Sequence, residues 1–460
     1  MEKQKAGVSS SNDLTEGSIV GKILLFALPV MASNLLQQLY NAVDSIVIGQ
    51  YAGSDAIAAV GVSNPIMLLF NALFIGFSLG AGIVVSQSFG AKDFDKLRRS
   101  INTTFTLAFS IGLVITVIGV SLSTPLLRLL NVPDDILGNS SLYLRIIFIG
   151  TIGNVFFNYG GGILRGLGDS RWPLLALAIS CVLNIVLDVV FVFGFGWGVA
   201  GVAWATIIGQ TLSGLVLAWR INRFGYGLKI SFREMLKPDL VLFKTIIRLG
   251  LPSGLQHMSR SLGSVLTQSF TNRFGSLFIA SNSVVQRVDG LVIMPMFGLG
   301  SSATTYVGQN IGAGKLDRAK KGINRILVMV FIFCAIMGVV MYFFGHNIAL
   351  AFTSEVEVVG IVKQGIQIIC FVYVFFGIDN TLSGSLKGAG VAIVPMISSI
   401  ISNFLKVPLV YFLATVPNDY IGTFYMMAIS MIIGAVTMLL YYKFGKWQEK
   451  GVRVAGPAIE

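Results

Sequence analysis

Residues 173–196 read PLLALAISCVLNIVLDVVFVFGFG and contain one charged residue, Asp188. As an α-helix, a stretch of this length would be about 36 Å long, which exceeds the roughly 30 Å hydrocarbon layer of a bilayer. Its apolar residues are continuous and do not alternate with polar ones, so the stretch favours a transmembrane helix over a strand of a membrane barrel. This segment predicts a chain built from membrane-spanning helices.

Stretches of the same kind recur along the whole chain. Of its 460 residues, 54% are hydrophobic and 12% are charged, and the mean hydropathy is +0.80. Soluble domains carry about 25% charged residues, so the composition predicts an all-α polytopic membrane protein. The twelve predicted spans cover residues 23–49, 57–86, 101–124, 142–163, 173–196, 199–219, 244–271, 278–307, 323–345, 359–384, 391–413 and 420–442.

The basic residues predict the orientation of these spans. If both termini are cytoplasmic, the cytoplasmic segments hold 26 of the 33 Lys and Arg residues, and the outer loops hold four. Cytoplasmic loops of membrane proteins carry such an excess. We therefore expect a multi-pass protein of the cytoplasmic (inner) membrane with both termini inside. The same distribution accounts for the net charge of +12, so we expect no nucleic-acid partner.

The residue types that most enzymatic sites need are scarce. The chain has two histidines, and its three cysteines all lie in apolar stretches, where we expect small core residues and no disulfide or metal ligands. Residues 312–315 (GAGK) resemble part of a phosphate-binding loop but lack its glycine spacing and the Ser or Thr that follows the lysine. We expect no enzymatic activity, no ATP-driven step and no cofactor.

The two halves of the sequence resemble each other. Leu28-Pro29 recurs as Leu251-Pro252, and residues 164–168 (LRGLG) recur as 386–390 (LKGAG), at offsets that differ by a single position. Near-constant offsets indicate a tandem duplication, with six helices in each copy. The predicted parts are a cytoplasmic tail over 1–22, an N-lobe over 23–220, a cytoplasmic linker over 221–243, a C-lobe over 244–443 and a cytoplasmic tail over 444–460.

Ionisable residues inside the N-lobe spans are candidates for function, because a charge within a bilayer is costly. Asp44 and Asp188 are the two clear cases, and Asn184 lies four residues before Asp188, on the same helix face. Thr206 lies at a similar depth in the next span. Two carboxylates, an amide oxygen and a hydroxyl suit a hard cation such as Na⁺, and a proton could take its place. Alternatively, the two acids only cap or bridge helices through hydrogen bonds.

The C-lobe spans carry a polar set of both charges. These side chains could form a static neutral network, a substrate site or a second coupling site. The candidates for this C-lobe polar site are Gln256, Arg260, Arg287, Asp289, Asp379 and Lys406.

Pro29 lies inside the first predicted span, some four turns before Asp44. A proline inside a helix removes a backbone hydrogen bond and favours a kink. The kink could bend in response to charge at Asp44, or it could be fixed and only shape the packing.

The ordered set of these motifs resembles the multidrug and toxic compound extrusion (MATE) family. The resemblance rests on Leu28-Pro29, residues 39–45 (LYNAVDS), 164–169 (LRGLGD) and 183–188 (LNIVLD), and it spans the whole chain. It implies a V-shaped transporter of two six-helix lobes that exports cationic, aromatic or amphipathic drugs by antiport with Na⁺ or H⁺.

The resemblance also implies roles for particular residues. The family's N-lobe cation site matches Asp44, Asn184, Asp188 and Thr206, which would be the ligands of Na⁺ if Na⁺ is the coupling ion. The family proline linked to bending of helix 1 matches Pro29.

The C-lobe departs from one branch of the family. That branch carries an acidic residue early in helix 7, whereas residues 256–260 here read QHMSR and contain no carboxylate. Asp379 resembles the acidic residue that the same branch has in helix 10.

The sequence therefore predicts a secondary active multidrug efflux transporter that works by alternating access of two lobes. We expect small organic molecules and the lipid bilayer as its partners, and a functional monomer. One alternative is a flippase for lipid-linked saccharide precursors from the same superfamily, which would need a cationic cavity. Another is a receptor or scaffold that transports nothing, which would leave the repeat and the buried acids unexplained.

Overall fold

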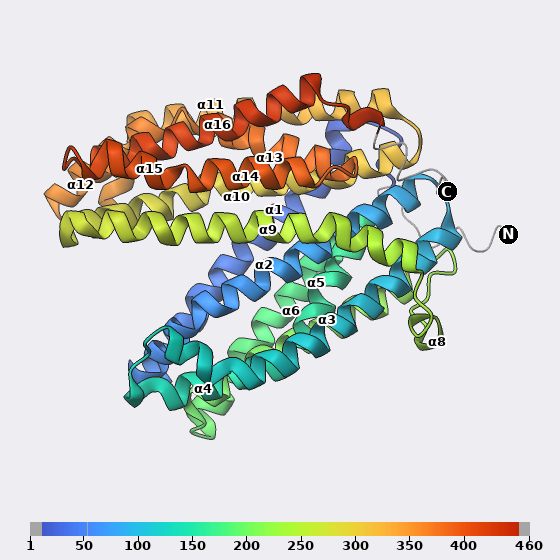
Figure 1. Cartoon of the computed structure of the whole chain (residues 1–460), viewed down its shortest axis with the longest axis horizontal. Helices are drawn as coiled ribbons and strands as arrows, with labels where there is room; N and C mark the ends of the chain where they lie inside the picture. The colour runs from blue at the N-terminus through green and yellow to red at the C-terminus, as the bar shows by residue number, and fades with distance from the viewer. Residues whose placement is uncertain (1–11, 53, 450–460) are drawn as a thin grey trace. The chain divides into compact units, whose positions relative to one another are not determined.

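The computed structural model describes residues 12–52 and 54–449 (Figure 1). These residues fold almost entirely into helices and include no β-strand, which confirms the all-α prediction. The helices in chain order are α1 (Ile19–Val47), η2 (Ile48–Ala52), α2 (Ser54–Gly90), α3 (Phe94–Leu129), α4 (Asp134–Ile149), α5 (Thr151–Gly166), α6 (Arg171–Asp188), η3 (Val189–Gly194), α7 (Gly198–Asn222), α8 (Phe232–Met235), α9 (Leu240–Thr271), η4 (Asn272–Phe274), α10 (Gly275–Gly312), α11 (Leu316–Leu350), α12 (Val356–Ile369), α13 (Tyr373–Gly388), α14 (Ile393–Phe404), α15 (Lys406–Val410), η5 (Tyr411–Thr415) and α16 (Ile421–Phe444).

The helices account for the twelve predicted spans. Within the described ranges, nine stretches are long and apolar enough to cross a membrane, and one of them, Leu240–Gly312, contains both α9 and α10. Two further spans are bent pairs, α4 with α5 and α12 with α13. The nine stretches with one counted twice, plus the two pairs, give twelve helical spans.

The bent pairs are longer than the sequence predicted. The predicted span 142–163 corresponds to α4 and α5, which meet at 50°, and the predicted span 359–384 corresponds to α12 and α13, which meet at 53°. At the first bend stands Gly150, where any β-carbon would clash with the side chain of Ile207 on α7. A larger residue there would push α7 away from the bend.

The tandem duplication predicted from sequence recurs in the helix boundaries. The bent pair that starts at Asp134 and ends at Gly166 has its counterpart at Val356 and Gly388, so both ends are displaced along the chain by the same amount. The π-helices η3 and η5 begin at positions related by that same offset. Features this local would not share one offset unless the two halves had the same fold.

A close helix contact also repeats between the halves. A β-carbon on Gly162 of α5 would lie 3.2 Å from the carbonyl carbon of Ser78 on α2. A β-carbon on Gly384 of α13 would lie 3.0 Å from the carbonyl carbon of Gly300 on α10. Both positions therefore require glycine, which lets two backbones meet in a membrane bundle.

The contacts divide the chain into two compact units. Unit 1 comprises residues up to Asp13 and Leu28–Gly254, and unit 2 comprises Leu14–Ala27 and Leu255–Glu460. The first helix of each repeat is thus shared: α1 changes unit one residue before Pro29, and α9 changes unit two residues after Pro252. The units defined by contacts therefore have their boundaries next to Pro29 and Pro252. The sequence repeat instead places the boundary between the two halves in the linker over 221–243.

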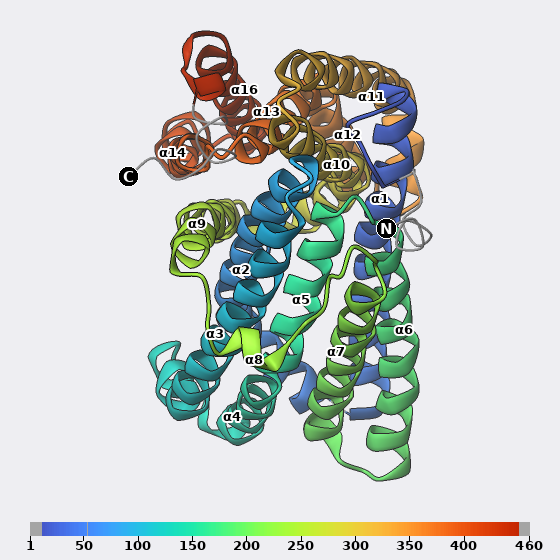
Figure 2. The ribbon, with the colours of Figure 1, turned by 90° about the vertical axis from the view of Figure 1, so that its right-hand side faces the viewer.

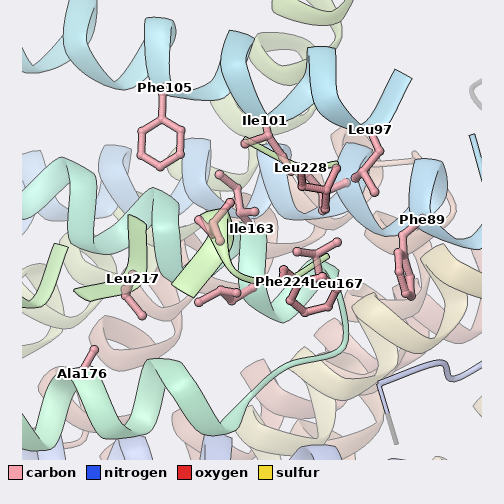
Figure 3. Packing of buried hydrophobic residues seen from close by; sticks show 13 residues of the cluster. Phe89, Leu97, Ile101, Phe105, Ile163, Leu167, Ala176, Leu217, Phe224 and Leu228 are labelled. Atoms are coloured by element: carbon pink, nitrogen blue, oxygen red, sulfur yellow. The ribbon is translucent and has the colours of Figure 1, made fainter. Parts of the chain in front are cut away.

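The helices of unit 1 pack around a buried apolar cluster. In Figure 2, α5, α6 and α7 run beside one another, and α7 contacts both of the others. Figure 3 shows the cluster between these helices and α3, with Phe105, Ile163 and Leu217 among its members. Each of these three side chains is fully buried. The cluster fixes α5, α6 and α7 to one another and so positions the polar residues they carry.

The predicted linker is fixed to helix α3 of unit 1. The side chain of Asn102 donates to Glu234 Oε2 at 2.8 Å and accepts from the backbone N–H of Ser231 at 2.8 Å. Arg99 forms an ion pair of 2.8 Å with Asp239. The linker therefore has a defined conformation against the bundle.

Candidate functional site

The four residues of the predicted cation site come from three helices of unit 1. Asp44 lies in the last turn of α1, and Asp188 is the last residue of α6, with Asn184 one turn before it. Thr206 lies in α7, which packs along α6. The structure thus brings together all four residues, although Asp44 is far from the other three in sequence.

The carboxyl groups of Asp44 and Asp188 are in direct polar contact. The Asp188 side chain is fully buried, and Oδ1 of each group is buried with no hydrogen-bond partner among the described residues. Two carboxylates in contact repel each other, so the pair requires a shared positive charge. A proton or a metal cation would supply it.

Asn184 joins the acidic pair to α7. With its amide oriented so that both ends find a partner, its Nδ2 donates to Asp188 Oδ2 at 3.1 Å, and its Oδ1 accepts from the backbone N–H of Thr206 at 3.2 Å. Thr206 Oγ1 donates to Val202 O at 3.0 Å. These bonds hold Asp188 against α7 and leave oxygen lone pairs free to bind a cation.

Two tyrosines that the sequence analysis missed belong to the same cluster. The Tyr40 hydroxyl lies close to Thr206 and to both acids, and Tyr143 of α4 lies close to both acids. Tyr40 precedes Asp44 by four residues, so helical spacing alone could have placed it on the same face. No local signal connects Tyr143 with Asp44, because two whole helices, α2 and α3, separate them in the chain.

Both acids lie next to π-helical turns. The π-helix η3 begins directly after Asp188, and η2 begins four residues after Asp44. The two π-helices contact each other, and η2 also contacts α7. Such turns are rare and are frequent at functional sites, because the wider turn changes the direction of side chains and frees backbone carbonyls. Here they end both acidic helices in the same region of unit 1.

Pro29 lies inside α1, as predicted. The hydroxyl of Ser33 donates to the Pro29 carbonyl at 2.8 Å. The part of α1 that belongs to unit 1 begins at Leu28, so Pro29 is its second residue. The same part of α1 carries Asp44. Whether it bends in response to charge at Asp44 stays a prediction.

The structure divides the predicted C-lobe polar site into separate groups. Arg260 of α9 pairs with Asp379 of α13, with 3.6 Å between Nη2 and Oδ2. The Asp289 carboxylate instead accepts a hydrogen bond from Tyr373, and Arg287 is exposed with no ion pair among the described residues. Asp289 and Arg287 therefore lie outside the group around Arg260.

Gln256 and Lys406 belong to the surroundings of Arg260. Gln256 Nε2 donates to Ser383 Oγ at 3.0 Å, and Gln256 Oε1 accepts from the ammonium group of Lys387 at 3.2 Å. Lys406 donates to Asn403 Oδ1 at 3.1 Å. Lys387 was counted only as a cytoplasmic charge in the sequence, yet it is buried and interacts with Arg260 and Asp379.

The three cysteines of the chain, Cys181, Cys334 and Cys370, are all buried and unpaired. Each packs as a small core residue, as the sequence predicted.

Comparison with known families gives one match, repeated in the two halves. The profile of the MatE family matches residues 29–190 and again residues 252–412. The two matches begin at Pro29 and at Pro252, so the profile follows the same repeat as the helix boundaries.

Individual proteins are similar over almost the full chain. The probable multidrug resistance protein YoeA of Bacillus subtilis (strain 168) is 30% identical over 443 residues, which cover 95% of this chain and 96% of that protein. The probable multidrug resistance protein NorM of Thermotoga maritima is 27% identical over 439 residues and 94% of each chain. A crystal structure of MATE in the bent conformation has a TM-score of 0.89 at 23% identity, and it covers 98% of this chain and 100% of that chain.

Proposed function

Since this chain belongs to the MATE family of multidrug efflux transporters, we propose that it exports cationic or amphipathic organic compounds by antiport with Na⁺ or H⁺. The observation that carries the proposal is the contact between Asp44 and Asp188, in which one buried oxygen of each carboxylate has no partner among the described residues. A transporter needs such a site only if a cation binds there for part of the cycle.

The coupling ion and the exported compound must prefer different states of the transporter. A ligand that binds two states equally shifts neither, however tightly it binds. We propose that the coupling ion binds between Asp44 and Asp188 in the outward-open state and lowers the affinity for the exported compound. Release of the ion in the inward-open state would leave the paired charges free to attract the next organic cation.

The oxygen ligands fit both coupling ions. Asp44, Asp188, Asn184 and Thr206 offer carboxylate, amide and hydroxyl oxygens, the ligands that Na⁺ prefers among protein groups. A single proton shared by the two carboxyl groups would satisfy the same pair. We therefore propose these four residues as the coupling site for either ion.

The setting of the transporter follows from the same proposal. We place it in the cytoplasmic membrane with both termini in the cytoplasm, because the basic residues gather in the segments that would then be cytoplasmic. We propose that one chain is functional by itself and needs no cofactor, since both acids and both polar partners come from unit 1 of the same chain.

Proteoliposomes test the proposal. Export of a fluorescent organic cation would be measured under a Na⁺ gradient and under a pH gradient imposed separately, for the wild type and for Asp188→Asn. We expect one gradient to drive export in the wild type and neither to do so in Asp188→Asn, which removes the charge but keeps the shape. Asp289→Asn is the matched control, because it makes the same change at a buried acid of unit 2.

Other results would contradict parts of the proposal. Driven export that persists unchanged in Asp188→Asn would remove coupling from this site and make Asp379 the next candidate. No export under either gradient would argue against drug antiport. Flipping of a lipid-linked saccharide precursor would then be the activity to measure, since Arg260, Lys387 and Lys406 could face its pyrophosphate.

A further inference from the structure

We propose that unit 2 contains a binding site for the anionic group of an aromatic organic acid, formed by Arg260, Lys387 and Lys406. This site goes beyond the proposed export of cationic compounds. It would let the transporter hold organic acids or zwitterions, and it is separate from the acidic pair of unit 1. Its ligand class is an aromatic ring that carries a carboxylate.

The first argument is the charge of the cluster. Arg260 interacts electrostatically with Lys387 and with Lys406. Asp379 is the one acid among the charged neighbours of these three residues in the described part of the chain. Asp379 is ion-paired with Arg260, so neither Lys387 nor Lys406 has a carboxylate partner among the described residues. Burying unpaired charge in a membrane protein is costly, so a network with only a structural role should be close to neutral.

The second argument is that the two lysines have neutral hydrogen-bond partners. Lys387 donates to Gln256 Oε1 at 3.2 Å, and Lys406 donates to Asn403 Oδ1 at 3.1 Å. An ammonium group has three donors, so each lysine can still donate to an anion. The amides orient the two lysines without neutralising them.

The third argument is the aromatic surface beside Arg260. The guanidinium carbon lies 5.6 Å from the ring centroid of Phe297 and 6.0 Å from that of Phe376. The two rings meet edge to face, with 5.6 Å between their centroids. A ring of a ligand could pack on these faces while its acid group meets the cations. Arg260 and Asp379 keep 23% and 19% of their side-chain surface exposed, so the cluster is not sealed.

The repeat shows how the two units differ. When the halves are aligned so that the first residue of η3 matches the first residue of η5, Asn184 corresponds to Lys406, and Asp188 corresponds to Val410. Unit 2 thus has an apolar residue where unit 1 has the Asp188 carboxylate, and a cation where unit 1 has the Asn184 amide. The duplication thus gave one unit a site for positive charge and the other a site for negative charge.

Binding of three matched naphthalene compounds to the purified full-length protein tests the proposal. Isothermal titration calorimetry would compare 2-naphthoate, its neutral amide 2-naphthamide and 2-naphthyl phosphate. We expect the wild type to bind 2-naphthoate more tightly than the amide. A charge-assisted hydrogen bond is worth enough that the Kd for 2-naphthoate should rise about tenfold or more in Lys406→Gln and in Lys387→Gln.

Two control variants separate the site from general effects. Lys406→Arg keeps the charge and should keep the affinity for 2-naphthoate. Arg287→Gln removes one exposed positive charge outside the cluster and should leave the Kd unchanged. The melting temperature of each variant shows whether a loss of binding reflects unfolding, and if Lys387→Gln fails to fold, Lys406→Gln still decides.

Specific results would overturn the proposal. Equal affinity for 2-naphthoate and 2-naphthamide would do so, as would a Kd in Lys406→Gln equal to that of the wild type. Tighter binding of 2-naphthyl phosphate than of 2-naphthoate would overturn the assignment of a carboxylate. Asp188→Asn should abolish driven export and leave 2-naphthoate binding intact, so the failure of either proposal is distinguishable from the failure of the other.

Discussion

At the scale of single residues, the acidic pair illustrates how a membrane protein keeps charge in an apolar setting. Asp188 is fully buried, yet Asn184 donates to one of its oxygens and ties it to the backbone of Thr206. Positioning therefore depends on a neutral amide, and Oδ1 of each acid has no hydrogen-bond partner among the described residues. A carboxylate whose oxygens were all satisfied by protein donors would have no reason to bind a transported cation.

Tyr40 offers a test of this positioning. Tyr40→Phe removes the hydroxyl that lies close to Thr206 and keeps the ring, so the packing should survive. A single hydrogen bond contributes about 0.5–1.5 kcal/mol, so we expect the half-saturating concentration of the coupling ion to rise about three- to tenfold. Initial rates of export at graded ion concentrations would measure it. An unchanged half-saturating concentration would show that Tyr40 does not position the site.

The acidic pair could be predicted from sequence because of the residues that make it. Asp44 and Asp188 are charges inside apolar runs, and Asn184 follows from helical spacing. Tyr143 and Lys387 could not be predicted in this way. A tyrosine is common near membrane boundaries, and a lysine at the end of a span looks like an ordinary cytoplasmic charge. Only the fold brings these two side chains next to other charged groups.

At the scale of the helices, the bends and the π-helical turns are the features that the sequence did not predict. The bends between α4 and α5 and between α12 and α13 contain no proline, and hydropathy is continuous across them. The π-helices η3 and η5 are equally invisible to a hydropathy window. Packing against a neighbouring helix produces such features, as Ile207 does at Gly150, and pattern alone does not reveal them.

Pro29 is a helix-interrupting residue that the sequence did predict inside α1, and its role can be tested. Pro29→Ala restores a backbone donor to α1, so the helix itself should become more stable. If bending of α1 is part of the transport cycle, turnover should fall at least severalfold while the Kd of the exported compound changes little. Comparing substrate binding with transport in proteoliposomes separates these effects.

Pro252→Ala is the matched variant, because it makes the same change in α9. Equal loss of turnover in both variants would mean that the two prolines act as a pair. Full turnover in Pro29→Ala would instead show that bending of α1 at Pro29 is not part of the cycle and that the proline serves only packing.

At the scale of the whole molecule, duplication explains both the fold and its two different polar sites. The bent pairs and the π-helices of the two halves keep one constant offset, so the backbone of the ancestral unit is retained in both copies. The polar side chains are not retained, since Asn184 and Asp188 correspond to Lys406 and Val410. Apolar packing fixed the architecture, and a few polar positions were free to diverge in charge.

The sharing of α1 and α9 between the units has a consequence for a chain cut in two. A break between Lys237 and Pro238, in the linker, would give fragments 1–237 and 238–460. Residues 14–27 would then be separated from the unit in which they pack, and so would residues 240–254. Each fragment would carry a helical segment, called its exchanged arm, that belongs to the unit formed by the other fragment: residues 14–27 in the first fragment and residues 240–254 in the second.

We therefore expect fragment complementation. Co-expressed fragments should copurify as a complex in detergent, and each fragment expressed alone should be degraded or should aggregate, because its exchanged arm and the surface that receives the other arm are both unfilled. Affinity purification through a tag on one fragment measures this, and two fragments that are each stable and fail to associate would contradict it. The two halves, although alike in sequence, would then be obligate partners: the duplicated gene produced a pair of domains that no longer fold apart from each other.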